Sequence, residues 1–253
     1  MSLSTDRLTD YLKKEGILVE ETDVIRNRDA VLEEIADACR RSGRDPKEVT
    51  LIAVSKTKPE EMIRTLYAVG TRDFGENYVQ ELDGKIADLP DDIRWHMIGH
   101  LQRNKVRYVV GRTAMIHSVD SLRLAEEISK ESVKKNVISR VLIEVNVAQE
   151  ENKFGFRLDE VKPFLQQAGT LPGIRFCGLM TSAPYTTNPE DNREYFRALK
   201  KLEIDINRSG IDNIQMDVLS MGMTCDYTVA VEEGATCVRV GTAIFGARDY
   251  SNR

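Results

Sequence analysis

The stretch VTLIAVSKTKPEEMIRTLYAVG (49–70) joins a short apolar run to an amphipathic segment through a turn that contains Lys56. The run VTLIAVS (49–55) is almost continuously apolar, which is typical of a strand buried on both faces of a parallel sheet. Pro59 suits the first turn of a helix and Gly70 suits its end. We therefore predict a buried strand followed by a helix, with a lysine at the carboxyl end of the strand.

The same alternation of apolar runs and amphipathic segments continues along the chain. The predicted strands are VTLIAVS (49–55), RDFG (72–75), RWHMIG (94–99), AMIHSV (114–119), SRVLIEVNV (139–147), IRFCGLM (174–180), QMDVLSM (215–221) and TCVRVG (236–241). Eight strand-and-helix units in 253 residues fit a single (β/α)8 TIM barrel, an α/β fold. The alternative, an open doubly wound sheet, normally carries a glycine-rich turn after an early strand, where this chain has SKTKPEE (55–61).

A helix is predicted before the first strand, over residues 23–43. Its apolar face consists of Val24, Val31, Leu32, Ile35 and Cys39. We expect this face to pack against the barrel. The predicted domain organisation is therefore an N-terminal extension over 1–22 and one barrel domain over 23–253.

Composition excludes several classes of protein. The net charge of -5 argues against a general nucleic-acid binder and against binding to anionic membranes. The four cysteines, Cys39, Cys177, Cys225 and Cys237, match no common zinc spacing and are typical of reduced thiols in a cytosolic protein. No signal peptide or membrane-spanning stretch is evident. We therefore expect a soluble cytoplasmic protein.

Lys56 is the first candidate for chemistry, because lysine is almost never fully buried unless it is paired or chemically used. A lysine whose amine reaches the barrel rim is one interpretation. The other is a desolvated amine that attacks an aldehyde. Active sites of such barrels lie at the carboxyl ends of the strands, where Lys56 is predicted.

Two loops near the end of the chain carry the chemistry of an anion site. SMGMTCD (220–226) offers the Ser220 hydroxyl, and Thr224 as a cap for the next helix. VRVGTAIFG (238–246) places Gly241 and Thr242 at a strand-to-helix turn, where free backbone N–H groups bind anions. Arg239 lies two residues before Gly241 and points the same way, into the barrel mouth. Barrels often bind phosphate at these loops, so a phosphorylated aldehyde is the predicted ligand.

His96 and His100 are four residues apart, as in some metal sites on helices. They are predicted on a strand and its following loop, where this spacing does not bring two rings together, and no H-E-x-x-H motif is present. We therefore expect structural roles for both histidines and no metal.

Seven motifs together resemble one family. They are AVSKTKP, FGENYVQE, WHMIGHLQRNK, IHSVDS, EVNVAQEENKFGF, LSMGMTCDY and VRVGTAIFG. In this order, over residues 24–247, they resemble the pyridoxal phosphate homeostasis protein family. The resemblance implies a single barrel of the alanine-racemase type (PLP fold type III) that binds pyridoxal 5'-phosphate (PLP).

The resemblance also implies roles for individual residues. Lys56 matches the lysine that forms a Schiff base with PLP, and Asn77 matches a position that lines the cofactor. Arg239 matches the arginine that faces the pyridine nitrogen. Lys153 matches a second lysine near the barrel mouth, a second PLP contact. The phosphate-binding positions are matched by Ser220, Gly241 and Thr242. Thr224 stands where family members often have serine, which preserves the hydroxyl.

The function implied is intracellular PLP (vitamin B6) homeostasis without substrate turnover, so no catalytic residue is assigned. An arginine beside the pyridine nitrogen disfavours a protonated ring, which is then a poorer electron sink. We expect no counterpart of the second, β-rich domain of alanine racemases, since only residues 247–253 follow Gly246. We therefore expect a monomer with an open barrel mouth. A low-activity amino-acid racemase and a barrel aldolase for a phosphorylated sugar are the alternatives, and delivery of PLP to apo-enzymes stays open.

Overall fold

Eight parallel strands form a closed barrel in the order β1 to β8, which confirms the predicted α/β TIM barrel. The computed structural model describes residues 19–211 and 214–246. The strands are β1 Thr50–Val54, β2 Asp73–Glu76, β3 Arg94–Met97, β4 Met115–Val119, β5 Ser139–Glu144, β6 Ile174–Met180, β7 Val218–Ser220 and β8 Cys237–Val240. Pairing of β1 with β8 closes the barrel. Each observed strand lies within one predicted run or extends it by one residue. Strand β5 ends at Glu144, before the end of its predicted run, because residues 145–147 belong to the loop that follows.

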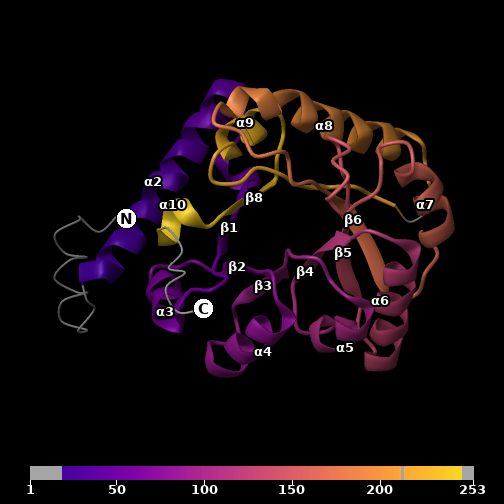
Figure 1. Cartoon of the computed structure of the whole chain (residues 1–253), viewed down its shortest axis with the longest axis horizontal. Coiled ribbons are helices and arrows are strands. Elements are labelled where there is room, and N and C mark those ends of the chain that lie inside the picture. The colour runs from indigo at the N-terminus through magenta and orange to yellow at the C-terminus, as the bar shows by residue number, and fades with distance from the viewer. Residues whose placement is uncertain (1–18, 212–213, 247–253) are drawn as a thin grey trace.

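Helices surround the barrel, as Figure 1 shows. They are α2 Val19–Ser42, α3 Glu60–Ala68, α4 Val79–Asp88, α5 Val106–Val109, α6 Leu122–Lys135, α7 Val161–Ala168, α8 Arg193–Arg208, α9 Tyr227–Glu232 and α10 Thr242–Phe245. Single 3-10 turns cover Pro46–Glu48, Arg103–Lys105 and Pro189–Asn192. None of these described helices combines the length and apolar character that a membrane crossing requires.

The leading helix α2 packs against α3, α9 and α10, as predicted for a helix that covers the barrel (Figure 1). Four residues of its predicted apolar face are buried, namely Val24, Val31, Ile35 and Cys39. The prediction for Leu32 was wrong: this residue is 40% exposed, because it follows Val31 by about 100° around the helix. The helix begins at Val19 and crosses the predicted boundary at residue 22 without interruption. Residues 1–18 lie outside the described part of the chain, so the predicted extension and barrel boundary stay predictions.

The barrel interior contains both an apolar cluster and buried polar groups. Met115, Leu142, Cys177 and Met180 pack into an apolar cluster separate from the main core. The buried polar groups come from β3, β4, β7 and β8, namely His96, His117, Ser220 and Arg239. Interiors of such barrels are usually filled by branched apolar side chains. The polar groups therefore require a specific explanation, because buried polar groups are costly unless they are hydrogen-bonded.

Candidate functional site

A cavity of about 600 Å³ opens at the carboxyl ends of the strands. Its lining residues are Val54, Lys56, Asn77, Ile98, Glu150, Lys153, Ser182, Ala183, Pro184, Tyr185, Thr186, Met223, Thr224, Cys225, Asp226, Arg239, Gly241 and Thr242. Six of the seven predicted binding residues are among them, and Ser220 is the exception. The volume lies within the range of small-molecule sites in proteins.

Lys56 is the second residue after the end of β1 and is half-buried at this cavity. The backbone on either side of it is held in place. Ser55 is fully buried, and Thr57 adopts a left-handed conformation with φ of 62°. The Thr57 N–H donates to Glu81 Oε1 at 2.6 Å, which ties the turn to α4.

The buried ammonium group of Lys85 is hydrogen-bonded to this turn. Lys85 Nζ, on α4, donates to Ser55 O at 2.8 Å, to Glu76 Oε1 at 2.8 Å and to Glu81 Oε1 at 2.6 Å. Ser55 Oγ donates to the same Glu76 oxygen at 2.6 Å. The side chains of Lys85 and Glu76 are 6% and 0% exposed. This buried pair was not predicted from the sequence; the i, i+4 spacing of Glu81 and Lys85 on a helix was its only signal.

Arg239 on β8 provides a fixed positive charge at the cavity. The residue is only 4% exposed. Its Nη1 donates to Ser220 Oγ at 2.7 Å, and its Nη2 donates to Thr181 O at 2.8 Å. Burial lowers the pKa of Arg239, and the nearby Glu144 carboxylate opposes this effect. Since an arginine in a protein stays protonated, the guanidinium remains cationic.

Ser220 does not reach the cavity. It is the last residue of β7, it is fully buried, and its hydroxyl oxygen accepts from Arg239 and lies 2.9 Å from His117 Nδ1. The half-buried Thr224 is the hydroxyl-bearing residue of this loop that lines the cavity. The prediction that Thr224 caps α9 was wrong, because Asp226 precedes that helix and its carboxylate accepts from Met223 N at 2.7 Å.

Gly222 has a structural role in the same loop. Its φ is +92°, and a Cβ atom at this position would lie 2.6 Å from Ala230 Cβ and 2.8 Å from Tyr227 Cα. The sequence predicted an anion site at SMGMTCD (220–226) and did not indicate this packing role. The structure places α9 against this glycine, so the residue is required for packing.

The loop after β5 brings Lys153 to the cavity. Lys153 Nζ donates to Ser182 O and to Ala183 O, both at 3.2 Å, and forms an ion pair with Glu150. The adjacent Phe154 stacks on His100, with ring centroids 3.7 Å apart. These contacts hold the loop across part of the barrel mouth and place two lysines on one cavity.

Glu144 adds a titratable group beside the cavity that the sequence did not indicate. It ends β5, and its Oε2 is a buried atom without a hydrogen-bond partner. Burial and, to a smaller extent, the Asp120 carboxylate raise the pKa of Glu144 from 4.5 to about 7, against the opposing effect of the Arg239 guanidinium. The carboxyl group therefore exchanges its proton near neutral pH.

His96 and His100 lie in different surroundings. His96 is inside the barrel, with Nδ1 2.9 Å from His117 Nε2, and His100 is at the mouth, with Nδ1 3.0 Å from Asp120 Oδ2. Within 19–211 and 214–246, no three His, Cys, Asp or Glu side chains lie together as metal ligands would. His96 and His100 therefore do not form a paired site.

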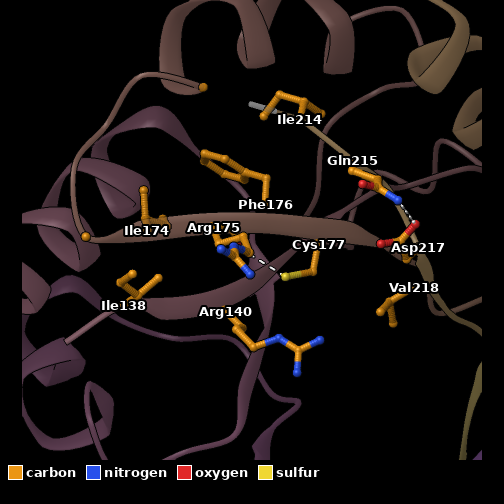
Figure 2. A pocket seen from close by; sticks show the side chains of 12 residues that line it. Ile138, Arg140, Ile174, Arg175, Phe176, Cys177, Ile214, Gln215, Asp217 and Val218 are labelled. Atoms are coloured by element: carbon orange, nitrogen blue, oxygen red, sulfur yellow. Dashed lines mark hydrogen bonds between the residues drawn. The ribbon is translucent and has the colours of Figure 1, made fainter. Parts of the chain in front are cut away.

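A second hollow of about 670 Å³ lies at the opposite end of the barrel, at the start of β5, β6 and β7 (Figure 2). Arg140 and Arg175 are register partners on β5 and β6, and both are exposed. Gln215 Nε2 donates to Asp217 Oδ1 at 3.0 Å on its other side. This hollow is slightly larger than the cavity at the carboxyl ends, but it includes none of the predicted binding residues.

Comparison with known proteins identifies the family. The sequence model of the alanine racemase N-terminal domain matches residues 27–249. The pyridoxal phosphate homeostasis protein of Aquifex aeolicus is 47% identical over 221 residues, which cover 87% of this chain and 96% of that protein. The protein of the same name from Escherichia coli K12 is 37% identical over 238 residues, which cover 91% of this chain and 99% of that protein. The chain belongs to the pyridoxal phosphate homeostasis protein family.

Solved structures agree with this family and with its fold. PipY of Synechococcus elongatus, solved with PLP bound, has a TM-score of 0.74 and 35% identity, and the match covers 85% of this chain and all of that one. An alanine racemase of Clostridium difficile has a TM-score of 0.70 at 13% identity, over 91% of this chain and 58% of that one, which shows the fold alone. The resemblance to the pyridoxal phosphate homeostasis protein family is therefore confirmed, and the barrel is of the alanine-racemase type.

Proposed function

We propose that this chain binds PLP at the carboxyl-end cavity, as a Schiff base on Lys56, and serves in PLP homeostasis without substrate turnover. One observation carries the proposal: a single cavity of about 600 Å³ is lined by Lys56, Arg239 and the turn Gly241–Thr242. An amine, a guanidinium and a strand-to-helix turn are the groups that an aldehyde, a pyridine nitrogen and a phosphate require.

The residues of the cavity fit this ligand. Asn77 Oδ1 is a buried acceptor without a hydrogen-bond partner, and a hydroxyl group of the ligand would satisfy it. Thr224 and Thr242 each bring a hydroxyl group to the same wall. We therefore propose Thr224, rather than the buried Ser220, as the phosphate contact after β7, together with Gly241 and Thr242. Lys153, whose amine is held by two carbonyl groups, is proposed as a second contact.

The fixed charge of Arg239 supports binding over turnover. When bound, PLP supplies an aldehyde that condenses reversibly with an amine and a ring that withdraws electrons most strongly when its nitrogen is protonated. Arg239 brings a buried positive charge to this cavity and donates N–H groups, so it favours a ring nitrogen that accepts a hydrogen bond. The names of the relatives from Aquifex aeolicus and Escherichia coli support a role in homeostasis.

The test is reductive trapping of PLP on the purified chain. We expect a visible absorbance band with PLP, and borohydride should fix a pyridoxyl group on the peptide that contains Lys56. Lys56→Ala should lose both signals. Lys58→Ala is the matched control, because Lys58 Nζ donates to Phe245 O and Gly246 O and does not line the cavity. A chain that stays colourless in excess PLP, or a label confined to Lys153, would overturn the assignment.

The racemase alternative is tested on the same preparation. We expect no exchange of enantiomers when the PLP-loaded chain is incubated with single amino acids, and sustained racemisation would replace the proposal by an enzymatic one. Storage and delivery are separated by adding an apo-enzyme and following the recovery of its activity. The predicted monomer is checked by sedimentation with and without PLP.

A further inference from the structure

Five polar side chains inside the barrel are hydrogen-bonded end to end. Asp73 Oδ1 lies 3.1 Å from His96 Nε2, and His96 Nδ1 lies 2.9 Å from His117 Nε2. His117 Nδ1 lies 2.9 Å from Ser220 Oγ, which accepts from Arg239 Nη1 at 2.7 Å. Because Asp73 begins β2 and Arg239 lines the cavity, this interior chain connects the amino end of the barrel to the candidate site.

The interior chain is buried along almost its whole length. His117 and Ser220 are 0% exposed, and His96 and Arg239 are 5% and 4% exposed. The side chain of Asp73 is 13% exposed and also accepts from Arg94 Nε at 2.8 Å. Inside a protein, such networks are rigid when every member is satisfied and costly when one is not. Each member therefore constrains the position of the next.

The two ends of the interior chain limit where its hydrogens can lie. Arginine only donates and a carboxylate only accepts. Ser220 Oγ accepts from Arg239, so its own hydrogen goes to His117 Nδ1. His117 then donates from Nε2 to His96 Nδ1, and His96 donates from Nε2 to Asp73. Both imidazoles are neutral in this arrangement, and every hydrogen bond points from Arg239 towards Asp73.

The opposite order between the histidines fits the structure less well. It requires a cationic His96 that donates to both His117 and Asp73, and His117 would then donate to Ser220. The Ser220 hydrogen would have no acceptor, since the described residues offer its side chain only these two contacts. Burial, with further contributions from His96 and Arg239, lowers the pKa of His117 well below its usual range, so His117 is neutral in either order. Burial raises the pKa of Asp73, but hydrogen bonds from His96 and Arg94 outweigh it and lower the pKa to about 2, so Asp73 is a carboxylate that only accepts.

We propose that the interior chain is a positioning device, in which His117, through Ser220, holds the Arg239 guanidinium so that its remaining N–H groups face the cavity. Three guanidinium contacts are made inside the protein, to Ser220 Oγ, Thr181 O and Ser182 Oγ. Arginine has five N–H groups, so donors remain for a ligand. Such a donor favours a ligand whose ring nitrogen has a free lone pair. This inference rests on the proposed PLP binding for its ligand, but the direction of the hydrogen bonds does not.

The direction of the hydrogen bonds is tested first, on the chain without ligand. Nitrogen NMR of the three histidines reports which ring nitrogen carries the hydrogen. We expect His117 and His96 to be neutral, with the hydrogen on Nε2 and an accepting Nδ1. A His117 with its hydrogen on Nδ1, or a cationic His96, would overturn the arrangement whether or not the chain binds PLP.

The positioning role is tested by ligand discrimination, as the ratio of Kd values for PLP and N1-methyl-PLP, whose ring nitrogen has no lone pair. The wild-type chain should prefer PLP by about tenfold or more, the usual effect of a hydrogen bond from a charged group. Ser220→Ala should reduce this preference below about threefold, and His117→Asn should reduce it similarly. Lys58→Ala is the control, because Lys58 lies outside the interior chain and does not line the cavity, and it should retain the wild-type ratio.

The outcomes separate the two proposals. A wild-type chain that binds neither ligand overturns the proposed function and with it the discriminating role, whereas the NMR result still decides the hydrogen-bond direction. A wild-type chain that binds PLP, with an unchanged ratio in Ser220→Ala, overturns the positioning role alone. Equal weakening of both ligands in that variant would show a merely structural role and would also overturn it.

Discussion

The two ends of the barrel have hollows of similar size, about 600 Å³ at the carboxyl end and about 670 Å³ at the amino end. They differ in how their charged groups are held. Arg239 at the carboxyl end is 4% exposed and hydrogen-bonded to three protein oxygens, whereas Arg140 and Arg175 at the amino end are exposed. Volume alone would choose the amino end. A buried and supported charge distinguishes the candidate site.

Buried charges are informative because they are costly. A charge that leaves water requires partners, whereas an exposed arginine requires none. The carboxyl end contains a second example, the ammonium of Lys85 bonded to Glu76, Glu81 and Ser55. Substitutions at the two ends should therefore have effects of different size. The following four predictions are ordered from the largest expected effect to the smallest.

Lys85→Met should have the largest effect on stability, because it leaves Glu76 fully buried without its cation. Breaking one partner of a buried ion pair costs about 3–5 kcal/mol. Urea unfolding measures the change. Lys130→Met is the matched control, since Lys130 is an exposed helix residue in an i, i+3 pair, and its effect should stay within about 0.5 kcal/mol. Similar losses in both variants would contradict the comparison.

Glu144→Gln should change how stability depends on pH. The pKa of Glu144 is raised from 4.5 to about 7 in the folded chain, so the folded state binds a proton that the unfolded state releases. Stability from this group is present below about pH 4.5 and is lost as pH rises to about 7, by about 3 kcal/mol in total. The variant should lose less stability between pH 5 and pH 8 than the wild type.

Urea midpoints at several pH values check this prediction for Glu144. Glu126→Gln, at an exposed position of α6, is the control and should keep the wild-type profile. If the two variants had the same pH profile, Glu144 would behave as a solvated carboxylate. The expected difference between buried charged groups at the carboxyl end and solvated ones on the surface would then not hold for Glu144.

Thr224→Val should weaken PLP binding about tenfold, the usual value of one hydrogen bond to a charged group. The loss should be absent for pyridoxal, which has no phosphate. Thr170→Val, an exposed residue before β6 at the amino end, should change neither affinity. Titration of the absorbance change measures both ligands. Equal losses for PLP and pyridoxal would remove Thr224 from the proposed phosphate site.

Arg140→Ala and Arg175→Ala should have the smallest effects. Both side chains are exposed, so each variant should stay within about 0.5 kcal/mol of the wild-type stability and should bind PLP unchanged. The same titration and unfolding curves measure this. A tenfold change in PLP affinity in either variant would show that the amino-end hollow affects the site, and would break the comparison.

The sequence pattern predicted the barrel because each strand buried on both faces is a short apolar run, and amphipathic helical segments separate these runs. The carboxyl ends of these runs then indicated Lys56, Arg239 and Gly241 as neighbours in space, and all three line one cavity. This reasoning does not predict the exact residue at which each strand ends. Ser220 was chosen for its hydroxyl, but it is the last interior residue of β7, and the chain leaves the strand before Thr224 reaches the cavity.

The residues that support the site could not be predicted, because their partners are distant in the sequence. His117 contacts Ser220 across 103 residues, and Lys85 contacts Ser55 across 30. In the sequence, His117 sits in an ordinary apolar run and Lys85 sits on an ordinary amphipathic helix. Their roles follow from the closure of the barrel, which brings β4 beside the interior face of β7 and α4 beneath the first turn.

The strained backbone of Thr57 lowers the stability of the turn that carries Lys56. A β-branched residue with φ of 62° is strained, and Lys85 and Glu81 hold the turn against that strain. Glycine would relieve the strain and would also free the backbone next to Lys56. In a search for heat-resistant variants, Thr57→Gly would therefore be an attractive choice and a misleading one. The selection would favour a more stable protein in which the Lys56 amine is held less firmly at the cavity.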